Sequence, residues 1–201
     1  MATDPQRFRP DAIVPNRIRM IKEGVDWLLF APASRLTFPK NVIRLVYVAK
    51  KLVDSGYRFK MIITGKGYLE GRLRKIVKKL GLAKYIVFDY ISEDELPYFY
   101  AISDVVVYPS LNEPFGLAVV EAMASGTAPV VANTGGPSET VIDGVTGIHV
   151  EGTGFKVLKR ETFFTPLPQI VSKLLRPFNL GGKIWTTSTK SFICTLGGTT
   201  S

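Results

Sequence analysis

The chain of 201 residues contains one cysteine, Cys194, and one histidine, His149. A single cysteine cannot form an intramolecular disulfide or a cysteine-based metal cluster. His149 ends a strand-like pattern, so we expect a strand-edge residue rather than a ligand or a base. No apolar run approaches the roughly 18 residues of a membrane-spanning helix, and no signal peptide opens the sequence. We therefore expect a cytoplasmic protein without a metal site.

A Gly-Lys-Ser or Gly-Lys-Thr sequence is also absent, which excludes a P-loop. What the chain does have is positive charge, with 26 Lys and Arg against 17 Asp and Glu, a net charge of +9. The densest cluster, residues 72–79, is typical of a solvated helix face, and no aromatic-interleaved basic patch indicates nucleic-acid binding. An anionic substrate, or an acceptor held at an acidic membrane surface, accounts for the charge equally well.

Apolar runs alternate with segments of helical periodicity over residues 27–150. Because the runs are continuous rather than alternating with polar residues, they predict a parallel sheet buried on both faces. The fold class is therefore α/β, a Rossmann-like doubly wound sheet in a single domain. The predicted strands are residues 27–33, 59–64, 85–88, 104–108, 127–132 and 147–150. The predicted helices are residues 42–55, 69–80, a segment from a capping box at 92–95 to about 102, one opening near residue 113, and 137–142.

The two ends of the chain differ from this central domain. Residues 1–26 form an approach segment, in which Pro10 and Pro15 argue against a continuous helix. After residue 150 the pattern degrades into an irregular tail, residues 151–201. Residues 163–175 are compatible with a helix, and nine of the sixteen residues 186–201 are Ser or Thr. The tail is therefore compatible with partly helical or disordered structure.

The predicted strands end in polar or glycine-containing loops. Since ligands of such sheets bind at the carboxyl ends of the strands, these loops should converge on one site. The loops are residues 35–40, 65–67, 90–91 and 112–117.

The last of these loops leads into a helix that is apolar nearly all round, apart from Glu121. An unpaired buried carboxylate costs several kcal/mol, roughly, so Glu121 either faces solvent, pairs with a Lys or Arg, or accepts hydroxyl groups of a ligand. Pro114 suits the first helical position, and the N–H groups of Phe115, Gly116 and Leu117 would then form an anion site. With Glu113 at the same mouth, the pattern favours a sugar nucleotide.

These residues resemble the donor-binding domain of family 4 retaining glycosyltransferases, over roughly residues 3–150. The carrying stretches are Glu113 and Glu121 with seven residues between them, the Pro-Phe-Gly after Glu113, the Glu-Ala-Met-Ala-Ser-Gly from Glu121, and residues 129–139 and 143–147. The resemblance implies metal-independent hexosyl transfer, with retention, from a UDP-, GDP- or ADP-linked sugar to a glycan, lipid or protein acceptor. It also implies that residues 1–26 correspond to an interdomain linker, so that the N-terminal acceptor domain is absent from this chain.

The resemblance also assigns roles. Arg35 and Lys40 would grip the diphosphate, Arg35 through two parallel hydrogen bonds and Lys40 as a point charge. Glu121 would accept the ribose hydroxyls and Glu113 those of the sugar. The expected catalytic residues are thus Glu113, Arg35 and Lys40, and the expected donor-binding residues are Glu121, Phe115, Gly116, Leu117, Gly65 (room for the nucleotide), and Tyr90 and Ile91 (main-chain borders of the base).

Two alternatives stay open. Gly65 and Gly67 follow a strand and Asp89 lies about twenty residues on, as in an NAD-dependent oxidoreductase, although Glu70 occupies the third glycine position, one place before Gly71. The chain is also compatible with a non-catalytic nucleotide-sugar-binding module, or with one subunit of a split transferase whose N-terminal domain is a separate polypeptide.

Overall fold

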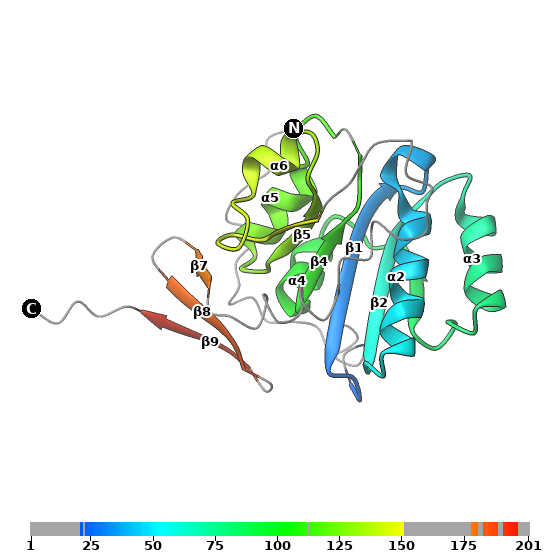
Figure 1. Cartoon of the computed structure of the whole chain (residues 1–201), viewed down its shortest axis with the longest axis horizontal. Coiled ribbons are helices and arrows are strands. Elements are labelled where there is room, and N and C mark those ends of the chain that lie inside the picture. The colour runs from blue at the N-terminus through cyan, green and yellow to red at the C-terminus, as the bar shows by residue number, and fades with distance from the viewer. Residues whose placement is uncertain are drawn as a thin grey trace, which may run out of the picture.

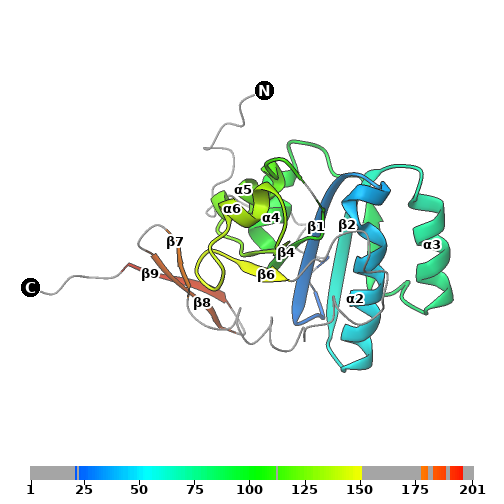
Figure 2. The ribbon, with the colours of Figure 1, turned by 45° about the horizontal axis from the view of Figure 1, so that its top comes forward.

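The computed structural model of the chain describes residues 21, 23–111, 113–150, 178–180, 183–188 and 191–196. Its main feature is a six-stranded, wholly parallel sheet in the order β3-β2-β1-β4-β5-β6 (Figure 1, Figure 2). The chain winds outward from β1 in one direction and then, through β4, in the other. The predicted α/β doubly wound sheet is confirmed, and its topological switch point lies between β1 and β4.

The elements follow one another in strict alternation. The strands of the sheet are β1 (Trp27–Arg35), β2 (Phe59–Lys66), β3 (Ile86–Asp89), β4 (Val105–Tyr108), β5 (Pro129–Ala132) and β6 (Ile148–Val150). The helices are the 3-10 helix η2 (Phe38–Lys40), α2 (Val42–Asp54), α3 (Glu70–Lys79), α4 (Leu96–Ile102), α5 (Leu117–Ala124) and α6 (Gly136–Thr140).

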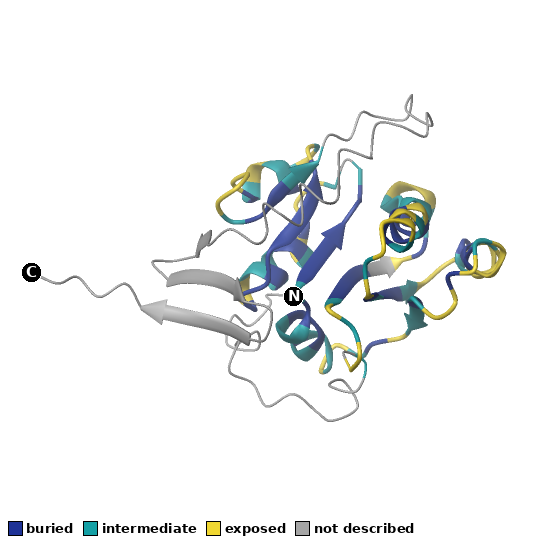
Figure 3. Cartoon of the chain, turned by 60° about the horizontal axis from the view of Figure 1, so that its bottom comes forward, coloured by how far each residue is buried: buried dark blue, intermediate teal, exposed yellow. Residues whose placement is uncertain are grey.

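The sheet is buried on both faces, as its continuous apolar strands predict (Figure 3). Along β1, Leu29 and Ala31 belong to the core cluster that includes α2 and α3, whereas Leu28 and Phe30 belong to the cluster that includes α4 and Ala122 of α5. Successive strand residues point to opposite faces, so one strand supplies both cores.

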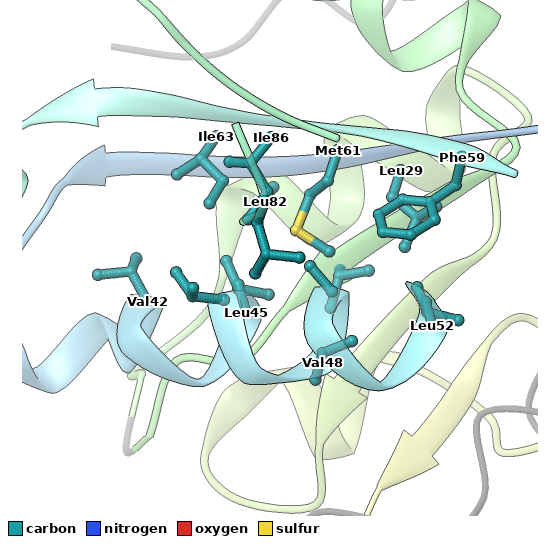
Figure 4. Close-up of a cluster of buried hydrophobic side chains, with 14 of the residues drawn as sticks. Leu29, Val42, Leu45, Val48, Leu52, Phe59, Met61, Ile63, Leu82 and Ile86 are labelled. Carbon is teal, nitrogen blue, oxygen red and sulfur yellow. The ribbon is translucent and has the colours of Figure 1, made fainter. Parts of the chain in front are cut away.

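Helix α2 shows how the first core is filled. Its residues Val42, Leu45 and Leu52 are almost fully buried and face the strand residues Phe59 and Met61 (Figure 4). Their successive spacings of three and seven residues place them on one stripe of the helix. Fully burying such a side chain contributes about 1.5–3 kcal/mol.

Two boundaries differ from the prediction. Helix α4 begins at Leu96 rather than at Ser92, and only half of the capping box forms. The Glu95 carboxylate accepts the Ser92 N–H at 3.4 Å, as in a capping box. The Ser92 hydroxyl, however, donates to that same carboxylate instead of accepting a backbone N–H. Pro97 explains the late start, because proline suits the first turn of a helix. Helix α5 also begins later than predicted, for a reason that belongs to the site.

The C-terminal part contains a separate antiparallel sheet that the sequence did not predict. Its strands are β7 (Phe178–Leu180), β8 (Lys183–Ser188) and β9 (Ser191–Leu196). The helix expected over residues 163–175, and the approach segment up to residue 20, lie outside the described residues. No helix in the described ranges combines the length and the apolarity that crossing a membrane requires.

The loops after β1 and β2 are joined by their backbones at the carboxyl edge of the sheet. The N–H of Leu36 donates to the carbonyl of Lys66 at 2.9 Å, and the N–H of Leu69 donates to the carbonyl of Leu36 at 3.2 Å. Gly67 lies so close that a Cβ there would stand 2.4 Å from the Leu36 carbonyl oxygen. Only glycine allows this approach.

Replacing Gly67 by alanine should therefore destabilise the fold, by roughly 1–3 kcal/mol, as other overpacking changes do. Gly71 in α3 is the matched control, because a Cβ there meets nothing within 4 Å. Gly71→Ala should stabilise the helix by up to about 1 kcal/mol. Thermal unfolding followed by circular dichroism measures both, and an equal Tm for the two variants would contradict the backbone contact.

Candidate functional site

An ion pair joins the two halves of the sheet at the switch point. Lys40, the last residue of η2 after β1, places its Nζ 2.5 Å from Oε2 of Glu113, in the loop after β4. The side chains are only 14% and 22% exposed. The structure thus brings together two of the predicted catalytic residues from positions 73 residues apart.

Two hydrogen bonds to backbone hold these loops in place. The side-chain amide of Asn41 donates to the carbonyl of Pro109 at 3.2 Å, and the N–H of Leu111 donates to the carbonyl of Pro39 at 3.2 Å. Asn41 has a φ of +54°, a conformation that asparagine tolerates better than most residues. Lys40 is therefore aimed by the turn that precedes α2.

Tyr108 and Ser110, which the sequence analysis did not single out, complete the surroundings of Glu113. The Ser110 hydroxyl donates to Glu113 Oε2 at 2.8 Å, and Lys40 Nζ lies 3.4 Å from the Tyr108 hydroxyl. Tyr108 is only 6% exposed, and the charge of Glu113 acts on its hydroxyl. A small hollow bordered by Lys40, Tyr108, Ser110 and Pro32 lies beside them.

Electrostatics in this cluster favour an ionised Glu113. Burial by itself raises the pKa of the Glu113 carboxyl, but the hydrogen bonds from Lys40 and Ser110 and the charge of Lys40 outweigh it, so the pKa is lowered from its ordinary value of 4.5. Burial, and then the charge of Glu113, raise the pKa of the Tyr108 hydroxyl well above its usual range. Tyr108 therefore remains a neutral donor.

Glu121 is half-buried in α5 and accepts a hydrogen bond that none of the sequence-based alternatives included. The hydroxyl of Tyr100, a fully buried residue of α4, donates to Glu121 Oε2 at 2.9 Å. Burial, followed by the charge of Glu121 and this hydrogen bond, raises the pKa of Tyr100 well above its usual range. The carboxylate is thus held by a neutral donor inside the protein.

The start of α5 corrects the predicted anion site. The helix begins at Leu117, with Gly116 as its N-cap at a φ of +81°, so Pro114 is not the first helical residue. Of the three predicted amides, only that of Leu117 lies in the first turn; Phe115 and Gly116 precede it.

Packing against α6 explains the correction. The N–H of Gly136 donates to the carbonyl of Glu113 at 2.8 Å, and a Cβ on Gly136 would stand 2.2 Å from the Pro114 carbonyl oxygen. A Cβ on Gly116 would likewise stand 2.8 Å from the Pro137 side chain. The neighbouring helix therefore holds residues 113–116 as a loop, which a sequence window around Pro114 cannot reveal.

Arg35 lies at the end of β1, opposite Lys66 at the end of β2. Both side chains are exposed, and none of the ion pairs within the described ranges includes either of them. The Lys66 ammonium stands 4.3 Å from the centre of the Tyr90 ring, which is 64% exposed. Arg35 and Lys66, which form none of the described ion pairs, therefore place positive charge at the same carboxyl edge of the sheet as Lys40.

The remaining predicted donor-binding residues are Gly65, Tyr90 and Ile91, and their surroundings differ. Gly65, the next-to-last residue of β2, has a φ of +129°, a conformation that requires glycine. Ile91 is a core residue, 6% exposed, and its N–H already donates to the Thr64 hydroxyl at 3.3 Å. Main-chain atoms near Ile91 are therefore partly committed to the fold, whereas Tyr90 faces solvent.

The geometry speaks against the dinucleotide fingerprint. In that fingerprint the glycine turn follows the first strand, at the switch point, and the third glycine permits close helix–strand packing. Here the turn follows β2, and Gly71, one place after the third glycine position, has open space around it.

Across the described residues, no three His, Cys, Asp or Glu side chains gather as a metal site would require.

A doubly wound sheet with polar side chains at its switch point places the chain among the α/β proteins that bind ligands at their strand ends. Sequence comparison gives the family. The model of the glycosyl transferases group 1 family matches residues 17–160, more than half of the chain. The chain belongs to this family.

Individual relatives agree with the assignment. The chain is 37% identical over 131 residues to an uncharacterized glycosyltransferase of Methanocaldococcus jannaschii, covering 65% of this chain and 33% of the relative. It is 36% identical to a lipopolysaccharide 1,2-N-acetylglucosaminetransferase of Salmonella typhimurium (65% and 36%) and 33% identical to a GDP-mannose-dependent phosphatidylinositol monomannoside mannosyltransferase of Mycolicibacterium smegmatis (75% and 41%). The chain thus spans about a third of the length of the curated relatives that it matches.

Solved structures show the same fold. The C-terminal domain of a glycosyl transferase group 1 family protein from Francisella tularensis superposes with a TM-score of 0.65 at 25% identity, covering 76% of this chain and 81% of that domain. An Anabaena protein solved in complex with UDP-glucose gives a TM-score of 0.63 at 24% identity, covering 75% and 42%. This chain therefore has the architecture of a glycosyltransferase C-terminal domain.

The Lys40–Glu113 pair predicts a pH dependence. The lowered pKa means that ionised Glu113 stabilises the fold above its ordinary value of 4.5, and that this contribution is lost as the pH falls toward the folded-state pKa. Glu113→Gln should lower the free energy of unfolding at pH 7 by about 1–3 kcal/mol and flatten its decline at acidic pH. Urea unfolding at pH 7 and at acidic pH measures both effects.

Glu70→Gln is the matched control. Glu70 pairs with Arg74 one turn along α3, where both side chains are more than a third exposed. Its loss should cost only about 0.2–0.5 kcal/mol. If the Glu113 and Glu70 variants were indistinguishable at pH 7, the buried pair would not be the constraint described above.

Proposed function

We propose that this chain is the donor-binding domain of a family 4 retaining glycosyltransferase with two Rossmann domains. It binds a nucleoside-diphosphate sugar, linked to UDP, GDP or ADP, at the carboxyl end of its sheet. The transferase moves the hexose to an acceptor without a metal ion. The observation that carries the proposal is the pairing of Lys40, which follows β1, with Glu113, which follows β4, at the switch point of the sheet.

The donor's own chemistry fits this arrangement. Its diphosphate carries negative charge, and its ribose and hexose present hydroxyl groups. The exposed Arg35 and the paired Lys40 offer positive charge for the phosphates, and the Leu117 amide at the start of α5 adds a backbone donor. Glu113 would accept hexose hydroxyls beside Lys40, and Glu121 would accept those of the ribose.

Transfer requires stabilisation of the departing diphosphate. The bond between the hexose C1 and the β-phosphate oxygen breaks, and its electron pair goes to that oxygen, where Arg35 and Lys40 stabilise the developing charge. The acceptor oxygen forms its new bond to C1 on the face from which the phosphate departs, which retains the configuration. The acceptor's proton passes to the departing phosphate oxygen, so this chain need supply no general base.

The relatives support the donor role and leave the acceptor to another domain. One relative is named a GDP-mannose-dependent mannosyltransferase, and the Anabaena neighbour was solved with UDP-glucose. Because this chain spans about a third of such relatives, we assign acceptor binding to an N-terminal domain, on the same or a separate polypeptide. The acceptor is a glycan, lipid or protein, reached from the cytoplasm, with a membrane-peripheral location for a lipid acceptor.

The competing function is a non-catalytic module that binds the nucleotide sugar without transferring it. The same site geometry serves both. A transfer assay with the donor, an acceptor mixture and a supplied N-terminal domain separates them: release of nucleoside diphosphate coupled to a glycosylated product supports the transferase, and donor binding without turnover supports the module.

Removing the Glu121 carboxylate should weaken donor binding. We expect the full chain to bind at least one of UDP-, GDP- or ADP-glucose in titration calorimetry, and Glu121→Ala to bind it about tenfold or more weakly, because buried hydroxyl contacts to a charged acceptor are lost. Glu70→Ala, a surface acid of α3, should bind as the unmodified chain does. Unchanged affinity in Glu121→Ala would remove this residue from the site.

Arg35 gives a separate test of the phosphate contact. Arg35→Ala should weaken binding of the free nucleoside diphosphate about tenfold or more, since a charged donor to phosphate is removed. Arg58→Ala is the control: Arg58 is equally exposed to solvent but pairs with Asp26 at the amino end of the sheet. Equal effects of the two substitutions would show a general charge effect rather than a phosphate contact.

A further inference from the structure

We propose that Tyr100 is the positioning residue that lets Glu121 distinguish a ribose from a deoxyribose in the donor. The inference rests on the function proposed above, in which Glu121 accepts the ribose hydroxyls. It assigns to a buried side chain on a neighbouring helix the control of that selectivity.

The position of Tyr100 is fixed by the core around it. Its side chain is fully buried, and its ring meets that of Phe30 edge to face, with centroids 5.1 Å apart and planes at 75°. The Thr127 hydroxyl donates to the Tyr100 carbonyl at 2.7 Å. Ring and backbone are therefore both anchored, so the hydroxyl is presented at a defined point.

That hydroxyl reaches Glu121 across the gap between two helices. The contact is 2.9 Å long and joins α4 to α5 on one face of the sheet. A glutamate side chain has three rotatable bonds and loses much rotamer freedom when it is held in place. Because the hydroxyl binds Oε2, the carboxylate is already oriented before a ligand arrives, which lowers the entropic cost of binding.

The hydroxyl also suits a carboxylate that must accept further hydrogen bonds. Two carboxylate oxygens together offer about four acceptor positions, so a carboxylate can accept several hydrogen bonds at once. A tyrosine donates one of them without adding a positive charge of its own. Neighbouring hydroxyls at C2 and C3 of a ribose match such an acceptor, whereas a deoxyribose lacks one of them.

The test removes the hydroxyl and measures sugar selectivity. Calorimetry compares UDP, GDP and ADP with their 2′-deoxy and 3′-deoxy analogues on the full chain, and the nucleotide that binds most tightly is used further. The unmodified chain should prefer the ribonucleotide by about tenfold. In Tyr100→Phe we expect the ribonucleotide to bind roughly three- to tenfold more weakly and the deoxy analogues to bind almost unchanged, so the preference narrows.

Further variants separate positioning from stability. Tyr85→Phe removes a tyrosine hydroxyl next to β3, at the amino end of the sheet, and should leave the preference unchanged. In the Glu121→Ala background, adding Tyr100→Phe should produce no further change in affinity. Tyr100→Met also removes the hydroxyl and keeps an apolar side chain in the core, so it should narrow the preference as well, and it serves as the second variant if Tyr100→Phe does not fold.

The outcomes distinguish this inference from the function on which it rests. A full ribose preference in folded Tyr100→Phe, or in folded Tyr100→Met, would overturn the role of Tyr100 while leaving Glu121 as a donor contact. An unchanged preference in Glu121→Ala would instead overturn the proposed ribose contact itself. A narrowed preference in Tyr100→Phe, together with no effect in Tyr85→Phe, supports the positioning role.

Discussion

The ion pair between Lys40 and Glu113 is the constraint on which the site depends. It joins the loop after β1 to the loop after β4. In this sheet, β1 and β4 are the only neighbouring strands that do not follow one another in the sequence. Neither residue is more than a quarter exposed, so each would be costly to hold alone. The additional hydrogen bond from the Ser110 hydroxyl to Glu113 offsets part of the loss of hydration.

The charges of the domain are distributed unequally along its strands. At the amino ends, Asp26 pairs with Arg58, and the carboxylate of Asp104 accepts the N–H of Leu28. These two acids are therefore engaged in holding the fold together. At the carboxyl ends, Arg35 and Lys66 form none of the described ion pairs, so their positive charge remains available to an anion.

Much of this could be predicted from sequence, because local signals determine it. Continuous apolar strands and the stripe of Val42, Leu45 and Leu52 indicate the alternating elements and hence the parallel sheet. The loops at the strand ends follow from topology alone, which is why Lys40 and Glu113 could be expected at one edge.

What sequence could not show depends on contacts between distant segments. The start of α5 is set by the approach of Gly136 to Pro114, 22 positions along the chain, so the local signal of a proline before an apolar run was misleading. Tyr100 and Tyr108 looked like ordinary core aromatics, and only the fold brings their hydroxyls to the acids. A signal did exist: an acid in an apolar helix requires a donor, and tyrosines in preceding apolar segments are the candidates to examine.

The choice of donor for each acid follows from the charge that its place demands. A lysine in place of Tyr100 would add a positive charge at the carboxylate of Glu121, whereas the Tyr100 hydroxyl orients that carboxylate without adding one. Glu113, by contrast, requires a positively charged partner, because its carboxylate keeps the Lys40 ammonium at the site and out of solvent. Pairing the two keeps an anion and a cation side by side, as the proposed donor, a hexose joined to a phosphate, would require. The Tyr108 hydroxyl, whose pKa is raised well above its usual range, lies 3.4 Å from Lys40 Nζ and adds no charge there.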